Sequence, residues 1–103
     1  MRSWALAGLP DGLLQQRYGS HADEHETSLM LHIAPQVVDM TRAVDDGADG
    51  DGLLTRSRGK GTWSSSGVLG QATLASAEKG RIIASVILEH CLTQILGLAQ
   101  RGK

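Results

Sequence analysis

The chain has no phenylalanine, and its aromatic residues are limited to Trp4, Tyr18 and Trp63. Leucine, isoleucine, valine and alanine must therefore fill the interior, and each buries less apolar surface than an aromatic side chain. Thirteen glycines add to the conformational entropy that folding must overcome. The 103 residues are therefore predicted to form one marginal domain, or a part of a domain that packs against more protein.

Other absences bear on partners and on the cellular compartment. The single cysteine, Cys91, excludes an internal disulfide and fits a reducing compartment, so we expect the protein in the cytoplasm. Ten basic and eleven acidic residues nearly balance, and there is no basic stripe with interleaved aromatics. There is also no uninterrupted apolar run of the about 18 residues that a membrane span needs, and no apolar secretion signal at the start. We expect neither a nucleic-acid partner nor a membrane partner.

The first predicted helix runs from about Asp23 or Glu26 to Ala34. Apolar residues recur there at helical spacing, and Pro35 disfavours helical backbone at the residue before it. Acidic residues in the first turn suit the positive end of the helix dipole. The segment QVVDM that follows, residues 36–40, is predicted to be extended.

The second predicted helix follows Ser76, a residue type that caps helix N-termini, and Gly102 supplies its stop. Gly80 lies near its start and favours close packing there, because glycine in a helix interior costs about 1 kcal/mol relative to alanine. The apolar stripe of this helix comprises Ile83, Ile87, Cys91, Ile95 and Leu98, broadened by Val86 and Leu88.

A glycine- and aspartate-rich segment, residues 45–52, invites comparison with a calcium-binding loop. An EF-hand loop needs carboxylates at its first, third and fifth positions and a glutamate at its twelfth. Counted from Asp45, the third position is Gly47 and the twelfth is Arg56, so the pattern fails. A surface loop is predicted instead.

The next segment, residues 57–73, has many glycines and serines and no apolar period, so it is predicted to be irregular. Trp63 within it is expected to pack on another element or to line a pocket. We treat residues 1–103 as a single partial domain, in which 1–19 form a poorly defined lead-in and 45–73 are rich in loops.

The densest group of reactive side chains is HADEHE, residues 21–26. His21, Glu24 and His25 spell H-x-x-E-H, the inverted form of a zinc-peptidase motif. In that interpretation both histidines lie on one helix face and bind zinc, and the glutamate is the general base. The helix would then have to begin before His21. In the simpler interpretation the acidic residues cap a helix start and the histidines are solvated.

Two blocks of the sequence stand in the order of the segments of a known family. HADEHETSLMLHIAPQVVDMTRA, residues 21–43, is similar to a family segment H-A-G-x-x-E-T-S-x-M-L that is followed by an apolar helix, a proline and a valine-rich turn. SSSGVLGQATLASAEKGRII, residues 64–83, is similar to the closing segment S-x-S-G-V-x-G-D-P-T-L-A-T-A-E-K-G. From about Tyr18 into the last helix, the chain therefore resembles the creatininase family of metal-dependent amidohydrolases.

The resemblance implies the α/β fold class: the C-terminal part of a three-layer α/β/α creatininase-like sandwich, with two main helices and short strands. It also implies hydrolysis of a cyclic amide or similar C–N bond in a small-molecule substrate, divalent metal ions such as manganese or zinc, and a homo-oligomer. His21 aligns with the family histidine that transfers a proton, a role that suits a neutral imidazole. Glu26 aligns with the family glutamate of E-T-S and is implied to act in catalysis, directly or by orienting a neighbour or holding backbone N–H groups.

The departures from the family pattern limit these expectations. Gly19 and Ser20 replace the acidic residue that usually precedes the histidine, and we expect Ser20 and Trp63 at the substrate pocket. Glu24 and His25 fall on variable family positions and are expected to be exposed. The metal-binding E-x-H and G-H-x-E segments are missing.

The chain is therefore expected to form one wall of the active site, to bind no metal by itself and to be inactive alone. Two alternatives stay open. One is the zinc peptidase, and the other is a small non-enzymatic interaction domain that docks through residues 76–101.

Overall fold

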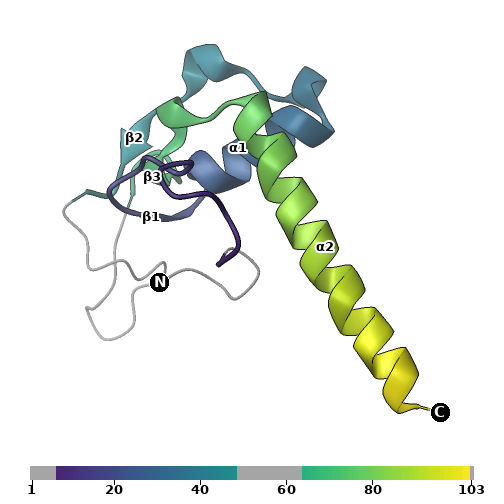
Figure 1. Cartoon of the computed structure of the whole chain (residues 1–103). Coiled ribbons are helices and arrows are strands. Elements are labelled where there is room, and N and C mark those ends of the chain that lie inside the picture. The colour runs from purple at the N-terminus through teal and green to yellow at the C-terminus, as the bar shows by residue number, and fades with distance from the viewer. Residues whose placement is uncertain (1–6, 49–63, 103) are drawn as a thin grey trace.

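A computed structural model describes residues 7–48 and 64–102, which form two helices, three short strands and three single 3₁₀ turns (Figure 1). In chain order the elements are β1 (Gly19–His21), α1 (Glu24–Ile33), η2 (Pro35–Val37), η3 (Met40–Arg42), β2 (Asp45–Asp46), β3 (Leu69–Gln71), η4 (Ala72–Leu74) and α2 (Ala77–Arg101). The predicted α/β class, with two main helices and short strands, is confirmed.

The three strands make one small antiparallel sheet in the order β1-β3-β2. Gly19 lies opposite Gly70, and Asp46 lies opposite Gly70 on the other side of β3. The pairing of β1 with β3 therefore places the lead-in of α1 beside the segment that precedes α2. As a result, the two blocks of sequence that resemble the family lie next to each other.

The first helix begins and ends where its sequence predicts. Asp23 is the N-cap, and its side chain accepts a hydrogen bond from the Glu26 N–H. The Ala34 N–H still bonds to the Met30 carbonyl, and Pro35 then starts a 3₁₀ turn.

The two helices cross at Gly80, which is buried on α2. An added Cβ at this position would lie 1.8 Å from the backbone oxygen of Ser28 on α1. The Ser28 hydroxyl, also buried, accepts a hydrogen bond from the N–H of Ser76, the N-cap of α2. The close packing that the sequence predicted at Gly80 is therefore confirmed.

The apolar core is small. Its buried members are Leu9, Leu69, Ala72 and Ile83. Leu9 and Ile83 form one cluster, and the side chains packed around it come from the lead-in and from both helices. These half-buried neighbours are Leu13, Leu14, Leu29, Val86 and Ile87. The lead-in, predicted to be poorly defined, therefore contributes to the core from its described residues.

Beyond this core, α2 extends away from the other elements (Figure 1). Ile83 is fully buried, but five large side chains further along are 50–64% exposed. They are Leu88, Leu92, Ile95, Leu96 and Leu98, which we call the distal face. The stripe predicted from the sequence thus exists on the helix, but only its first part is covered.

By length and composition alone, α2 could also cross a membrane; core helices of soluble proteins pass the same test when they are mostly buried, whereas the apolar window of α2 is 6% buried. Glu89, His90 and Gln94 interrupt the apolar stretch of this helix.

Three predictions for the connecting segments are wrong. Residues 36–40 are not an extended strand, because two 3₁₀ turns flank Val38 and Asp39. The segment expected as a loop from residue 45 opens with strand β2, and the segment expected to be irregular up to residue 73 contains strand β3. In both strands the pairing comes from partners far away in the sequence, which a local pattern does not record.

Candidate functional site

The turn between β1 and α1 presents the predicted proton-transfer histidine. His21 ends β1, pairs with Leu69 and is exposed. The next residue, Ala22, has a φ of +49°, the one positive φ of a non-glycine residue in the described parts of the chain. Such a backbone conformation costs of order 1–3 kcal/mol and persists where the surrounding contacts hold it.

Two side chains of α1 hold the strained residue. The Ala22 N–H donates a hydrogen bond to Glu26 Oε2, and the Thr27 hydroxyl donates to the Ala22 carbonyl at 3.4 Å. Both side chains belong to the first turn of α1, so the start of this helix fixes the peptide group that follows His21. Glu26 thus holds a backbone N–H group, one of the two supporting arrangements that the resemblance implied for it.

A network of hydrogen bonds that includes buried side chains supports this turn. Asp23 is buried, and its Oδ2 accepts a hydrogen bond of 2.8 Å from Gln16 Nε2. The Gln16 Oε1 in turn accepts from the Glu24 N–H. An added Cβ on Gly70 would lie 2.4 Å from the Asp23 Cβ, so β3 can approach the helix cap only because residue 70 is glycine.

Glu24 is fully buried, so the expectation that it is exposed is wrong. Its Oε1 accepts from the N–H groups of Gln15 and Gln16 at 2.7 and 2.9 Å, and its Oε2 forms an ion pair of 2.6 Å with Lys79 of α2. The ammonium of Lys79 also donates to Gln15 Oε1 and to the Leu74 carbonyl. This carboxylate therefore joins the lead-in to both helix starts.

The zinc-peptidase geometry is absent. His21 lies in β1 and His25 is the second residue of α1, so the two histidines do not share a helix face. Glu24, the general base of that motif, is occupied by Lys79 and by backbone N–H groups. The five-letter match therefore does not correspond to a shared zinc site, because His21 ends a strand and Glu24 forms an ion pair.

His25 is only partly exposed, which also corrects the expectation for it. Its Nε2 is buried and has no hydrogen-bond partner. A metal ion would need further ligands beside it, yet in residues 7–48 and 64–102 no group of three or more His, Cys, Asp or Glu side chains could hold one.

Two aspartates at the edge of the sheet accept hydrogen bonds from hydroxyl groups of the chain. Asp46 accepts from the hydroxyls of Ser66 at 2.7 Å and Ser64 at 2.9 Å, and these bonds lower its pKa to about 2. Asp45 accepts from the Thr73 hydroxyl at 2.6 Å and its N–H at 3.2 Å, and the hydroxyl bond is the largest cause that lowers its pKa. The sequence shows the two aspartates, but their hydroxyl partners lie 18 to 28 residues away, so local spacing does not predict these hydrogen bonds.

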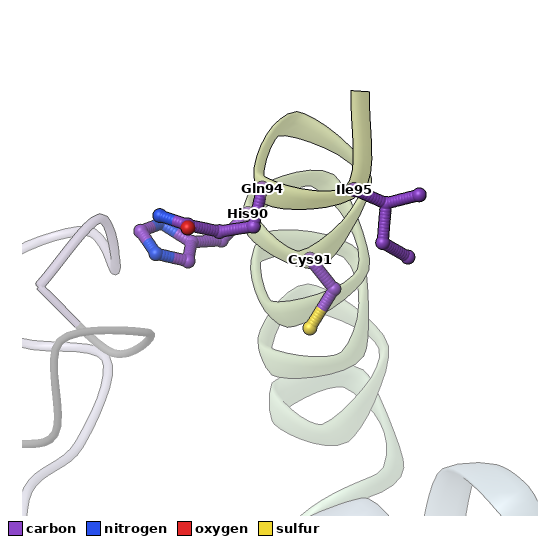
Figure 2. A pocket seen from close by; sticks show the side chains of 4 residues that line it. All are labelled: His90, Cys91, Gln94 and Ile95. Atoms are coloured by element: carbon purple, nitrogen blue, oxygen red, sulfur yellow. The ribbon is translucent and has the colours of Figure 1, made fainter. Parts of the chain in front are cut away.

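Among the predicted pocket residues, Ser20 is exposed beside His21 in β1, whereas Trp63 lies outside the described residues. A groove of about 560 Å³ opens elsewhere, on α2, where it is lined by His90, Cys91, Gln94 and Ile95. Figure 2 shows that the His90 and Gln94 side chains project to one side of the helix and Ile95 to the other. The groove does not include any of the predicted site residues among its described lining.

The sequence comparisons fit this geometry. The profile of the family described as creatinine amidohydrolase matches residues 3–95. The chain belongs to the creatininase family. The mycofactocin precursor peptide peptidase of Mycobacterium ulcerans (strain Agy99), a member of this family, is 35% identical over 95 residues, which cover 89% of this chain and 36% of that protein. No solved structure matches significantly.

Membership in the creatininase family confirms the resemblance read from the two blocks. The chain nevertheless spans little more than a third of the length of its mycobacterial relative. Enzymes of the creatininase family are generally metal-dependent. The described residues do not fit a metal centre, because they bring no three ligands together.

Proposed function

We propose that this chain forms one wall of an active site that hydrolyses C–N amide bonds, and that His21 transfers the proton. In such a reaction water adds to the carbonyl carbon, the C–N bond breaks, and the departing nitrogen takes up a proton. An exposed imidazole at the end of a short strand can reach a substrate and can both accept and deliver that proton.

The observation that carries this proposal is the strained turn at Ala22. Backbone strain concentrates at active sites, where the position of a side chain matters more than local stability. Here Glu26 and Thr27 hold the peptide that directly follows His21. We assign Glu26 to positioning, because its carboxylate bonds to backbone within the turn.

The proposed substrates are cyclic amides and peptides. A cyclic amide is the substrate class that the resemblance implies, and the mycobacterial relative is named for a precursor peptide. Both contain a C–N bond between a carbonyl carbon and nitrogen, so the same proton transfer serves either.

The metal requirement belongs to the complete protein. A divalent ion, manganese or zinc, would polarise the carbonyl and activate water there. Since the described residues bring no three ligands together, we assign this ion to other residues and expect the 103-residue chain alone to be inactive. Hydrolysis of creatinine by the purified chain in the presence of manganese or zinc would contradict this expectation.

The test of His21 uses this chain co-expressed with the part of the mycobacterial relative outside the matched region. We expect the complex to hydrolyse creatinine or the precursor peptide, and His21→Asn to lower kcat by about 10²–10⁴-fold. The matched control is His32→Asn, since His32 is exposed in the last turn of α1. Full activity of a folded His21→Asn complex would refute the role of His21.

One observation favours the second candidate, a non-enzymatic interaction domain: the distal face of α2 is exposed. A folded complex without hydrolysis of either substrate would support this alternative. A cytoplasmic location, the lack of nucleic-acid and membrane partners, and assembly into homo-oligomers remain predictions from the sequence.

A further inference from the structure

The distal face of α2 lacks any cover from the described parts of the chain. Its five side chains are 50–64% exposed, and together they offer roughly 500 Å² of apolar surface. A contiguous apolar patch of this size on a soluble protein commonly marks a contact surface. We infer that the distal face is the surface on which the remaining part of a creatininase domain packs.

A lipid bilayer fits this surface poorly. Ile83 is fully buried in the body and Val86 and Ile87 pack against the core, so only residues 88–101 are free, and they span about 21 Å as a helix, against about 30 Å of hydrocarbon. Glu89 lies within this stretch, and His90 and Gln94 share one side of it (Figure 2). A helix that is apolar on one side favours a one-sided partner, such as a protein surface.

A second copy of this chain also fits poorly. A stable interface buries about 800 Å² on each partner, which exceeds the roughly 500 Å² that the distal face offers. Self-association through α2 would also leave both edges of the sheet without a new partner, since among the described strands β1 and β2 each pair with β3 alone. Exposed apolar side chains at the end of α1 and after it, Ile33 and Val37, would remain open as well.

The remaining part of a creatininase domain meets these requirements together. The matched region makes up 36% of the mycobacterial relative, so most of that protein is available to pack on it. The family match runs to Ile95, so three residues of the distal face, Leu88, Leu92 and Ile95, lie within the family sequence.

The experiment measures assembly, so it does not depend on the proposed function. The tagged 103-residue chain is co-expressed with the part of the mycobacterial relative outside the matched region, and the mass of the purified complex is determined by light scattering. We expect a complex that contains the two polypeptides in a one-to-one ratio. Leu92→Lys should reduce the recovered complex at least tenfold, because it places a charge in the buried contact.

The matched control is Thr93→Lys, which introduces the same charge at the neighbouring exposed position, away from the distal face. It should leave recovery within twofold, and circular dichroism verifies that both variants keep their helices. Three results would each overturn the inference: no complex, equal loss with both variants, or an isolated chain that forms a dimer or binds phosphatidylglycerol vesicles through Leu92. A stable complex without hydrolysis would leave the inference intact and count against the proposed function alone.

Discussion

The two halves of α2 differ in what surrounds them, although they form one continuous helix. In residues 77–87, Lys79 makes a buried ion pair, Gly80 touches the backbone of α1, and Ile83 is fully buried. In residues 88–101 the large apolar side chains face outward. Local sequence suffices to make a helix in both halves, whereas only the first half is part of the folded body. Stability measurements on this chain should therefore report mainly on residues 77–87.

The largest effect is expected at the buried ion pair. Lys79→Met leaves the carboxylate of Glu24 buried without a counter-charge, which should cost about 3–5 kcal/mol of unfolding free energy. Urea unfolding followed by circular dichroism measures this cost. The double variant with Glu24→Gln should recover part of it, since the uncompensated charge is gone.

The control for this ion pair is on the same helix. Arg81→Met removes an exposed pair with Glu78 and should change stability by no measurable amount. Equal destabilisation by Lys79→Met and Arg81→Met would show that the Glu24 contact does not hold the two helix starts together.

The second prediction compares two glycines of α2. Gly80→Ala should cost about 2–3 kcal/mol, because its Cβ would lie 1.8 Å from the Ser28 oxygen and the helices would have to separate. Gly97→Ala meets nothing within 4 Å and should stabilise the helix by about 0.5–1 kcal/mol. Thermal unfolding of both variants gives the two signs directly, and the same sign for both would disprove the difference between the halves.

A smaller effect is expected from acid at the sheet edge of the body. The pKa of Asp46 is lowered from 3.8 to about 2 by hydrogen bonds from Ser66 and Ser64. A carboxyl whose folded pKa is depressed contributes stability above its unfolded pKa, and this contribution is lost as the pH falls from about 4 to about 2. Urea midpoints measured across this range should decline less steeply in Asp46→Asn than in the natural chain. Parallel declines would exclude a contribution of Asp46.

The smallest effect is expected on the distal face. Leu92→Ala in the isolated chain should change stability by less than about 0.5 kcal/mol, because Leu92 is half exposed. Ile83→Ala, on the buried half, should cost about 2–5 kcal/mol. A cost at Leu92 close to that at Ile83 would mean that the distal face is already covered in this chain.

Within the candidate site, sequence reasoning located the residues but not their environment. His21 and Glu26 were found through the resemblance, and the structure brings them to the two sides of one turn. Glu24 was misjudged because it falls on a variable position of the family, and its partner Lys79 lies 55 residues away. The strain at Ala22 had no sequence signal, since alanine normally avoids a positive φ.

The sequence by itself determined where the helices begin and end, because caps, proline and helical spacing act over a few residues. Ser76 and Gly102 were placed correctly on that basis, and the observed cap Asp23 is one of the two starts predicted for the first helix. Only the tertiary structure decided which side chains are buried and which strands pair. Burial and strand pairing depend on groups far apart in the chain, such as Gly80 with Ser28 and Asp46 with Ser66. Their free energies come from contacts that no local pattern encodes.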